Sequence, residues 1–174
     1  QVGSIAVRVL SFDDSALKAD FWEVMLARAL QVRIATGLHN ASGISTNCYR
    51  LVHGEGDNLP GLIIDYYDGV CVLQAHSVGM FRAKKHISDA LQKVYGSDLK
   101  AVYDKSSGTA PFKAGLELID GYLYQREGFN DDEQVVMENG QKFMVNWTEG
   151  QKTGFFLDQR DNRALVGQMA NGRN

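Results

Sequence analysis

The residues whose types and spacing could do chemistry are concentrated in an eleven-residue run, TGFFLDQRDNR, from Thr153 to Arg163. The run combines aromatic rings, carboxylates, side-chain amides and two guanidinium groups just before a helical pattern. Planar hydrogen-bonding side chains at this density suit recognition of a nucleotide-like ligand or an RNA phosphate. An ordinary capped helix start would explain the same residues without a ligand. Asp158 would be the cap, Phe155 and Phe156 would belong to the core, and Arg160 and Arg163 would be solvated. Spacing alone favours the ordinary helix start.

Individual side chains of this run differ in what they can bind. The ring of Phe156 can stack on a base, the carboxylate of Asp158 can accept from a ligand hydroxyl, and the amide of Gln159 can pair with a base edge. Arg160 and Arg163 are three residues apart, so they project from one side of a helix and can bind a phosphate or a carboxylate together. These five residues are the candidate ligand contacts.

A second basic cluster lies in the middle of the chain. Arg82, Lys84, Lys85 and His86 fall on the outward side of a helical pattern over 80–95, where they could contact nucleic-acid phosphates. A solvated helix face is the commoner explanation of such a cluster. The net charge of −3 gives no overall nucleic-acid signature, so an RNA-binding surface would have to be local.

Neither thiol has surroundings that favour catalysis. Cys48 and Cys71 stand in apolar strand patterns without an arrangement of Lys or His that would lower a thiol pKa, which predicts core packing and leaves no catalytic residue to assign. Two cysteines form no disulfide framework, and the four histidines have no partner at ligand spacing, so no metal site is predicted. The sequence has no signal-peptide pattern and no long apolar run. It therefore predicts a soluble cytoplasmic protein without a membrane partner.

The elements that must position these residues follow from changes in the hydrophobic period. A helical stripe covers 13–36, with Asp14 or Ser15 as its cap, and a polar loop follows over 38–47. The period then becomes two, which predicts strands over 48–53, 61–67 and 70–76. The dipeptide Asp68-Gly69 is typical of a two-residue hairpin turn between the last two strands.

The second half of the chain continues with alternating element types. A helix over 80–95 ends at Gly96, and a strand follows over 99–105. The stretches 116–119 and 122–126 are predicted as short strands, and Asn139-Gly140 joins 133–138 to 141–147 as a second hairpin. The last helix covers 158–170, with one side expected to face inward: Leu165, Val166 and Met169. The fold class is therefore α+β, a small mixed or antiparallel sheet with packed helices.

Two stretches of the chain resemble one protein family. The run from Gly150 to Arg163 and the segment from Tyr49 to Asp65 (YRLVHGEGDNLPGLIID) are similar to signatures of the RlmI-like class I S-adenosylmethionine-dependent methyltransferases of 23S ribosomal RNA. They stand in the family's order and at about its spacing. The chain departs from the family at Lys105-Ser106-Ser107-Gly108, where a more charged connection is usual, and this puts an RNA role for that loop in doubt.

The resemblance implies a division of the chain into parts of a larger enzyme. Residues 1–12 would be the last strand of a truncated RNA-binding PUA domain, and 13–47 a linking helix and loop. Residues 48–128 would form the central α+β domain. Residues 129–174 would be a hairpin and a helix that lead into a Rossmann-like catalytic domain beyond the chain, where the cofactor turn and the cysteine nucleophile would lie.

The resemblance also implies an activity, transfer of a methyl group from S-adenosylmethionine to ribosomal RNA, with cytosine C5 as the expected acceptor and base flipping as the means of access. Phe156, Asp158, Gln159 and Arg160 would lie at the cofactor, while RNA would be contacted by four basic residues: Arg163, Arg82, Lys84 and Lys85. The chain alone would be inactive and would bind the cofactor weakly or not at all. A homodimer is compatible with the sequence. The alternative is a non-enzymatic RNA-binding or interaction module.

Overall fold

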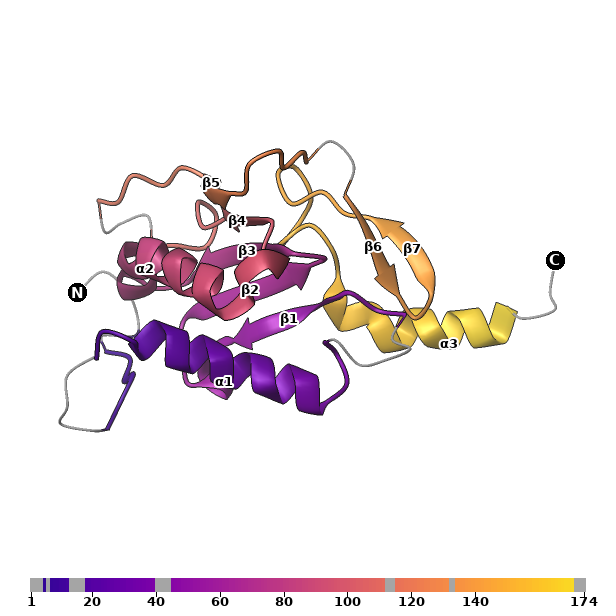
Figure 1. Ribbon diagram of the computed structural model, residues 1–174, viewed down its shortest axis with the longest axis horizontal. Helices are drawn as coiled ribbons and strands as arrows, with labels where there is room; N and C mark the ends of the chain where they lie inside the picture. The colour runs from indigo at the N-terminus through magenta and orange to yellow at the C-terminus, as the bar shows by residue number, and fades with distance from the viewer. Residues whose placement is uncertain are drawn as a thin grey trace.

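A five-stranded sheet with helices on one face and a hairpin with loops on the other forms the centre of the computed structural model (Figure 1). The structure describes residues 5, 7–12, 18–39, 45–111, 115–131 and 134–170. The strands lie in the order β1-β2-β3-β4-β5. Among the described strands, the β3–β4 pair alone is parallel, so the predicted α+β class with a mixed sheet is confirmed.

The first three strands form the predicted antiparallel meander. They are β1 (Cys48–His53), β2 (Leu62–Tyr67) and β3 (Val70–Ala75). The connection from β1 to β2 contains a short 3-10 turn, Gly54–Asp57. Asp68 and Gly69 have φ values of 43° and 94°, and a turn with two positive φ angles matches the right-handed twist of the strands it joins. The predicted hairpin is therefore present.

A helical crossover explains the single parallel pair. After β3 the chain enters α2 (Val78–Tyr95), whose first turn is capped by Ser77 accepting from the Met80 amide at 3.2 Å. Gly96 ends the helix with a φ of 54°, as predicted. The chain then returns as β4 (Ala101–Asp104) beside β3, and β5 (Gly121–Gln125) pairs antiparallel with β4.

Side chains that alternate along the strands divide the interior into two cores. On β2, Leu62 and Ile64 point to the core shared with α1 (Phe21–Ala35) and α2, whereas Tyr67 points to the opposite core. This second core also contains Val145 and Trp147 and is bounded by the predicted hairpin, now β6 (Val135–Glu138) and β7 (Gln141–Met144). The second core therefore holds the segment that leads to the signature run.

Three predicted elements differ in the structure. Helix α1 begins at Phe21, because 18–20 form a turn; the expected caps Asp14 and Ser15 lie outside the described residues. The stretch 116–119 is not a strand; it is β5 that pairs with β4 in the described sheet. The described residues of 1–12 also form no strand, and they have no strand partner in the described part of the sheet.

The last helix, α3 (Arg160–Ala170), follows a short 3-10 turn over Leu157–Gln159 and extends away from the sheet (Figure 1). The inward orientation predicted for its apolar side is wrong. Leu165, Val166 and Met169 are 50%, 64% and 63% exposed. No element among the described residues covers this side, so an amphipathic pattern exists here without a packing partner.

Candidate functional site

The two stretches that resemble the methyltransferase signatures meet at a buried carboxylate. Asp65, at the end of the first stretch, is fully buried on β2. Arg50 from β1 donates to both of its oxygens, at 2.8 and 3.1 Å, and the Thr153 hydroxyl donates to Oδ2 at 2.6 Å. The Tyr67 hydroxyl lies 2.8 Å from the Thr153 hydroxyl. A buried carboxylate requires such partners, so this network fastens the signature loop to the sheet.

Close backbone contact explains the glycines that flank Thr153. Gly154 has a φ of 113°, and a Cβ placed there would come within 2.8 Å of the backbone of Asn146 and Trp147. Gly150 is equally restricted by the Asn146 carbonyl, and its own carbonyl accepts from the Lys105 ammonium. Only residues without a side chain allow the loop over 150–154 to lie this close to the preceding turn.

A second buried carboxylate receives both arginines of the run. Glu138, at the end of β6, is 2% exposed. Arg163 donates to its two oxygens from Nε and Nη2 at 2.7 and 2.8 Å, and the Nε of Arg160 lies 3.5 Å from Oε2. The Arg163 guanidinium also lies 4.3 Å above the ring of Phe155. The two arginines thus bind one carboxylate together, as their spacing allows, but that carboxylate belongs to the protein.

Arg160 has a further internal partner. Its Nη2 donates to the carbonyl of Cys48 at 2.7 Å, which connects the start of α3 to the start of β1. The Nε of Arg160 is buried without a hydrogen-bond partner. Hydrogen bonding to Glu138 raises the pKa of Arg163 further above its ordinary value. Both guanidinium groups are therefore engaged with partners inside the domain.

The remaining polar groups of the run lie together at the surface. Lys152 adopts a left-handed backbone (φ 54°) and places its ammonium 4.5 Å above the Phe156 ring and 3.2 Å from an Asp158 oxygen. Gln159 donates to the other Asp158 oxygen at 3.4 Å. The lysine and the glutamine amide lower the pKa of Asp158. The ring of Phe156 is 39% exposed, whereas Phe155 packs in the second core.

The basic residues of α2 lie on the other side of the sheet from this surface. Arg82 and Lys85 are exposed, but Lys84 donates to the buried Asp104 at 2.7 Å and lies 4.1 Å above the Phe81 ring. Since α2 packs on the first core and the signature loop on the second, the structure does not bring the two candidate clusters together.

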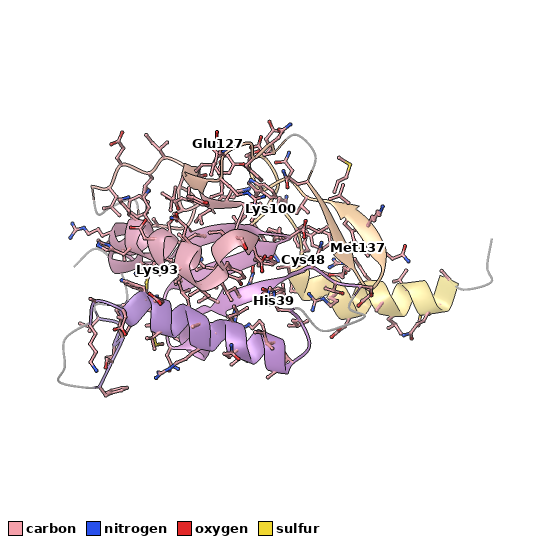
Figure 2. All side chains as sticks on the ribbon, in the orientation of Figure 1. His39, Cys48, Lys93, Lys100, Glu127 and Met137 are labelled. Carbon is pink, nitrogen blue, oxygen red and sulfur yellow. The ribbon has the colours of Figure 1, made fainter. Side chains whose placement is uncertain are left out.

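Both cysteines are buried in the core, as predicted. Burial raises the pKa of the Cys48 thiol to about 11 and that of Cys71 further, so neither is a ready nucleophile. Cys48 lies beside Met137, where the sheet meets the hairpin β6–β7 (Figure 2). Within the described ranges, no group of three or more His, Cys, Asp or Glu could hold a metal ion. None of the helices described is long and apolar enough to cross a membrane.

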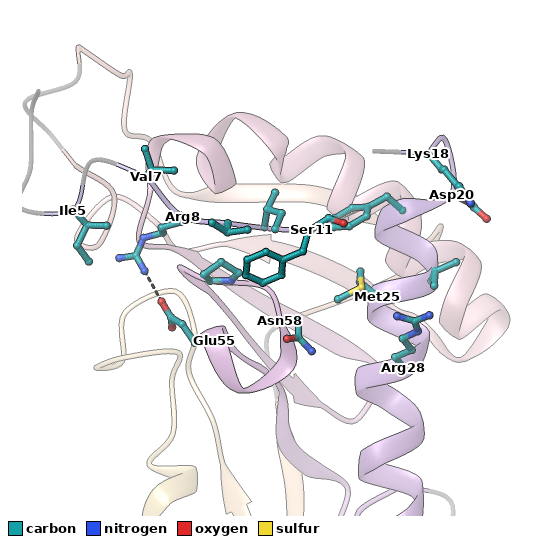
Figure 3. A pocket seen from close by; sticks show the side chains of 16 residues that line it. Ile5, Val7, Arg8, Ser11, Lys18, Asp20, Met25, Arg28, Glu55 and Asn58 are labelled. Atoms are coloured by element: carbon teal, nitrogen blue, oxygen red, sulfur yellow. Dashed lines mark hydrogen bonds and ion pairs between the residues drawn. The ribbon is translucent and has the colours of Figure 1, made fainter. Parts of the chain in front are cut away.

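A groove of about 680 Å³ is bounded by the N-terminal segment and α1, with an Arg8–Glu55 ion pair among its lining residues (Figure 3). Its lining is mainly apolar and includes Val9, Phe21 and Met25. No candidate ligand contact of the run lines this groove.

Sequence reasoning assigned no role to four residues that help to hold the run in place: Asp65, Glu138, Lys152 and Thr153. A signal for one of them existed. Glu138 and Val136 are two apart on a strand, and since Val136 is a core residue, the carboxylate had to face inward as well. A charged residue on an inward position predicts a buried ionic partner.

Comparison with known proteins shows that the chain is similar to one part of proteins named ribosomal RNA large subunit methyltransferases. It is 38% identical over 170 residues to ribosomal RNA large subunit methyltransferase I of Pseudoalteromonas atlantica. The matched residues make up 97% of this chain and 41% of the relative. A ribosomal RNA large subunit methyltransferase of Deinococcus radiodurans is 36% identical over 154 residues, which are 88% of this chain and 37% of that relative. The chain thus spans about two fifths of the length of these relatives. No protein-family model matches it.

Solved structures share the fold. A candidate S-adenosylmethionine-dependent methyltransferase from Streptococcus mutans superposes with a TM-score of 0.72 and 23% identity over 95% of this chain and 39% of that one. A second, a candidate methyltransferase in complex with S-adenosylhomocysteine, gives the same TM-score and identity.

Proposed function

We propose that this chain, a homologue of one part of the ribosomal RNA large subunit methyltransferase I proteins, serves in an S-adenosylmethionine-dependent enzyme that methylates ribosomal RNA. The observation that carries the proposal is the buried contact between Asp65 and Thr153. The two stretches of the resemblance are fastened to each other by this contact, so they act as one structural unit. The expected acceptor is cytosine C5 of 23S ribosomal RNA.

The described residues fit one side of a cofactor site. S-adenosylmethionine has an adenine ring, ribose hydroxyls and a sulfonium that supplies an electrophilic methyl group. Phe156 offers an exposed ring face, Asp158 a carboxylate that can accept from hydroxyls, and Gln159 an amide for a base edge. We assign the cofactor contacts to these three residues. Arg160 fits less well because its guanidinium is engaged with Cys48 and Glu138.

RNA contacts are assigned in the same way. Arg82 and Lys85 are exposed and can approach phosphates, whereas Lys84 and Arg163 are held by Asp104 and Glu138. Arg82 and Lys85 would then add affinity for RNA without reading its sequence. The proposed substrate places the protein in the cytoplasm.

The test is methyl transfer by the longer protein that the proposal requires. Tritiated S-adenosylmethionine and unmodified 23S ribosomal RNA are the substrates, and bisulfite sequencing locates any C5-methylated cytosine. Gln159→Ala should reduce the rate at least tenfold, whereas Gln168→Ala, an exposed change on α3, should leave it unchanged. A parent protein that binds RNA but transfers no methyl group would favour the non-enzymatic binding module instead.

A further inference from the structure

Helix α3 is attached to the domain mainly through its first turn. Its residues from Leu165 to Ala170 are all exposed, while Arg160 and Arg163 are partly buried. The direction in which α3 leaves the domain therefore depends on contacts of these two arginines. Both turn toward Glu138, which makes this carboxylate the common point of attachment.

Glu138 is itself held in place by the sheet. The hairpin β6–β7 is bound to the start of β1, because the Asn47 amide donates to the Met137 carbonyl at 2.9 Å and the Met137 amide donates to the Asn47 side chain at 2.6 Å. Near the turn, the Gly140 amide donates to the Ser45 carbonyl at 2.8 Å. A buried carboxylate on so constrained a strand end has little freedom to move.

Positive charge exceeds negative charge around Glu138, because one carboxylate lies beside two guanidinium groups. Arg163 donates hydrogen bonds to both carboxylate oxygens, whereas the Nε of Arg160 is buried without a hydrogen bond. The first turn of α3 carries these two positive side chains and one acidic residue, Asp161, so positive charge is in excess at the end of the helix where the dipole favours an anion. Removal of the Glu138 charge would leave both guanidinium groups without a compensating negative charge, and Arg160 would keep only its hydrogen bond to the Cys48 carbonyl. We would expect the arginines to turn toward solvent.

We infer that Glu138 is a positioning residue that sets the direction of α3 and keeps the preceding turn, with Asp158 and Gln159, at its place on the surface. It does so by holding Arg160 and Arg163, and it touches no ligand itself. The consequence for methyl transfer rests on the proposed function; the consequence for the helix direction does not.

Spin labels can measure the helix direction in this chain directly. Cysteines introduced at exposed Asp89 on α2 and Gln168 on α3 would carry nitroxides, and the buried native thiols of Cys48 and Cys71 should resist labelling. Pulsed dipolar spectroscopy of the parent should give one narrow distance distribution. Glu138→Gln should at least double its width or add a second population, whereas Glu149→Gln, at an exposed position, should leave it unchanged.

The alternative is that Glu138 contributes stability alone. In that case the folded fraction of Glu138→Gln would keep the narrow distribution, and this result would overturn the inference. If Glu138→Gln does not fold, Arg163→Gln supplies the same test, since it removes both short bonds and leaves Arg160 in place. In the longer protein, parent activity tests the proposed function separately. Loss of activity in Glu138→Gln beside an active parent, together with broadened distances, would support both ideas.

Discussion

Thr153 donates a hydrogen bond of 2.6 Å to the carboxylate of Asp65, although the two residues are 88 positions apart in the chain. The contact joins the loop over 150–154 to strand β2 of the sheet. Asp65 also accepts hydrogen bonds from Arg50, and the Thr153 hydroxyl also lies within hydrogen-bonding distance of the Tyr67 hydroxyl. All but Arg50 are buried, so the loss of one member leaves polar groups without partners in an apolar setting.

Replacement of Thr153 by Val tests this network. The substitution keeps the shape but removes the hydroxyl, which leaves a lone pair of Asp65 and the Tyr67 hydroxyl unsatisfied. The free energy of unfolding should fall by about 1–3 kcal/mol in chemical denaturation. Thr148→Val, at an exposed position, should change it by less than about 0.5 kcal/mol. Equal effects of the two variants would contradict a structural role for the buried hydroxyl.

Alanine at Gly154 should destabilise the chain. Its φ of 113° is unfavourable for a residue with a side chain, and the added Cβ would meet backbone atoms at 2.8 Å. We expect a loss of roughly 1–3 kcal/mol. Gly167→Ala is the matched control, because Gly167 lies in α3 with open space around it, and it should be neutral or stabilise by about 0.5–1 kcal/mol. A tolerated Ala at 154 would mean that the loop adopts another path.

Truncation of Arg163 should lower stability as well as any activity. Arg163→Ala removes two charge-assisted hydrogen bonds to a buried carboxylate, which are worth roughly 1.5–3 kcal/mol. Arg82→Ala on the exposed side of α2 should cost less than about 0.5 kcal/mol. Thermal unfolding of the two variants compares them. If Arg163→Ala unfolds at the same temperature as the parent, Arg163 has no structural role and is again a candidate for ligand binding.

The thiol of Cys48 should make stability depend on alkaline pH. Burial raises its pKa from 9.0 to about 11, so between these values the thiol ionises in the unfolded chain but stays neutral in the folded one. The contribution to stability is complete below pH 9 and is lost as the pH rises toward 11. Urea titrations at pH 8 and pH 10 should show the decline, and Cys48→Ala should make it shallower. An unchanged slope in Cys48→Ala would assign the decline to other groups.

The chain by itself should bind S-adenosylmethionine only at millimolar concentration or more weakly. Phe156, Asp158 and Gln159 form an open surface, and one side of a site leaves most of a ligand in solvent. Isothermal titration calorimetry on this chain measures the dissociation constant. A micromolar value, about 8 kcal/mol of binding, would require a site elsewhere among its residues.

Local sequence signals determined much of the architecture. Asp68-Gly69 and Asn139-Gly140 predicted two hairpins because few dipeptides adopt two positive φ angles at low cost, and both turns are present. The two-residue period predicted β1, β2 and β3, and the helical period with Gly96 predicted α2. The same local view placed Cys48 and Cys71 in the core. These features depend on neighbours a few residues apart.

The tertiary structure decided what the signature residues contact. Spacing indicated that Arg160 and Arg163 could bind one carboxylate, but only the packing of β6 against the start of β1 made that carboxylate Glu138. The amphipathic pattern of α3 predicted a buried side that is exposed, and the stretch 116–119 is not a strand, whereas β5 pairs with β4. A periodic pattern of apolar residues indicates that a residue can be buried or that a segment can pair as a strand. Which partner it meets depends on contacts between distant segments, and these form only when the sheet and its two cores assemble.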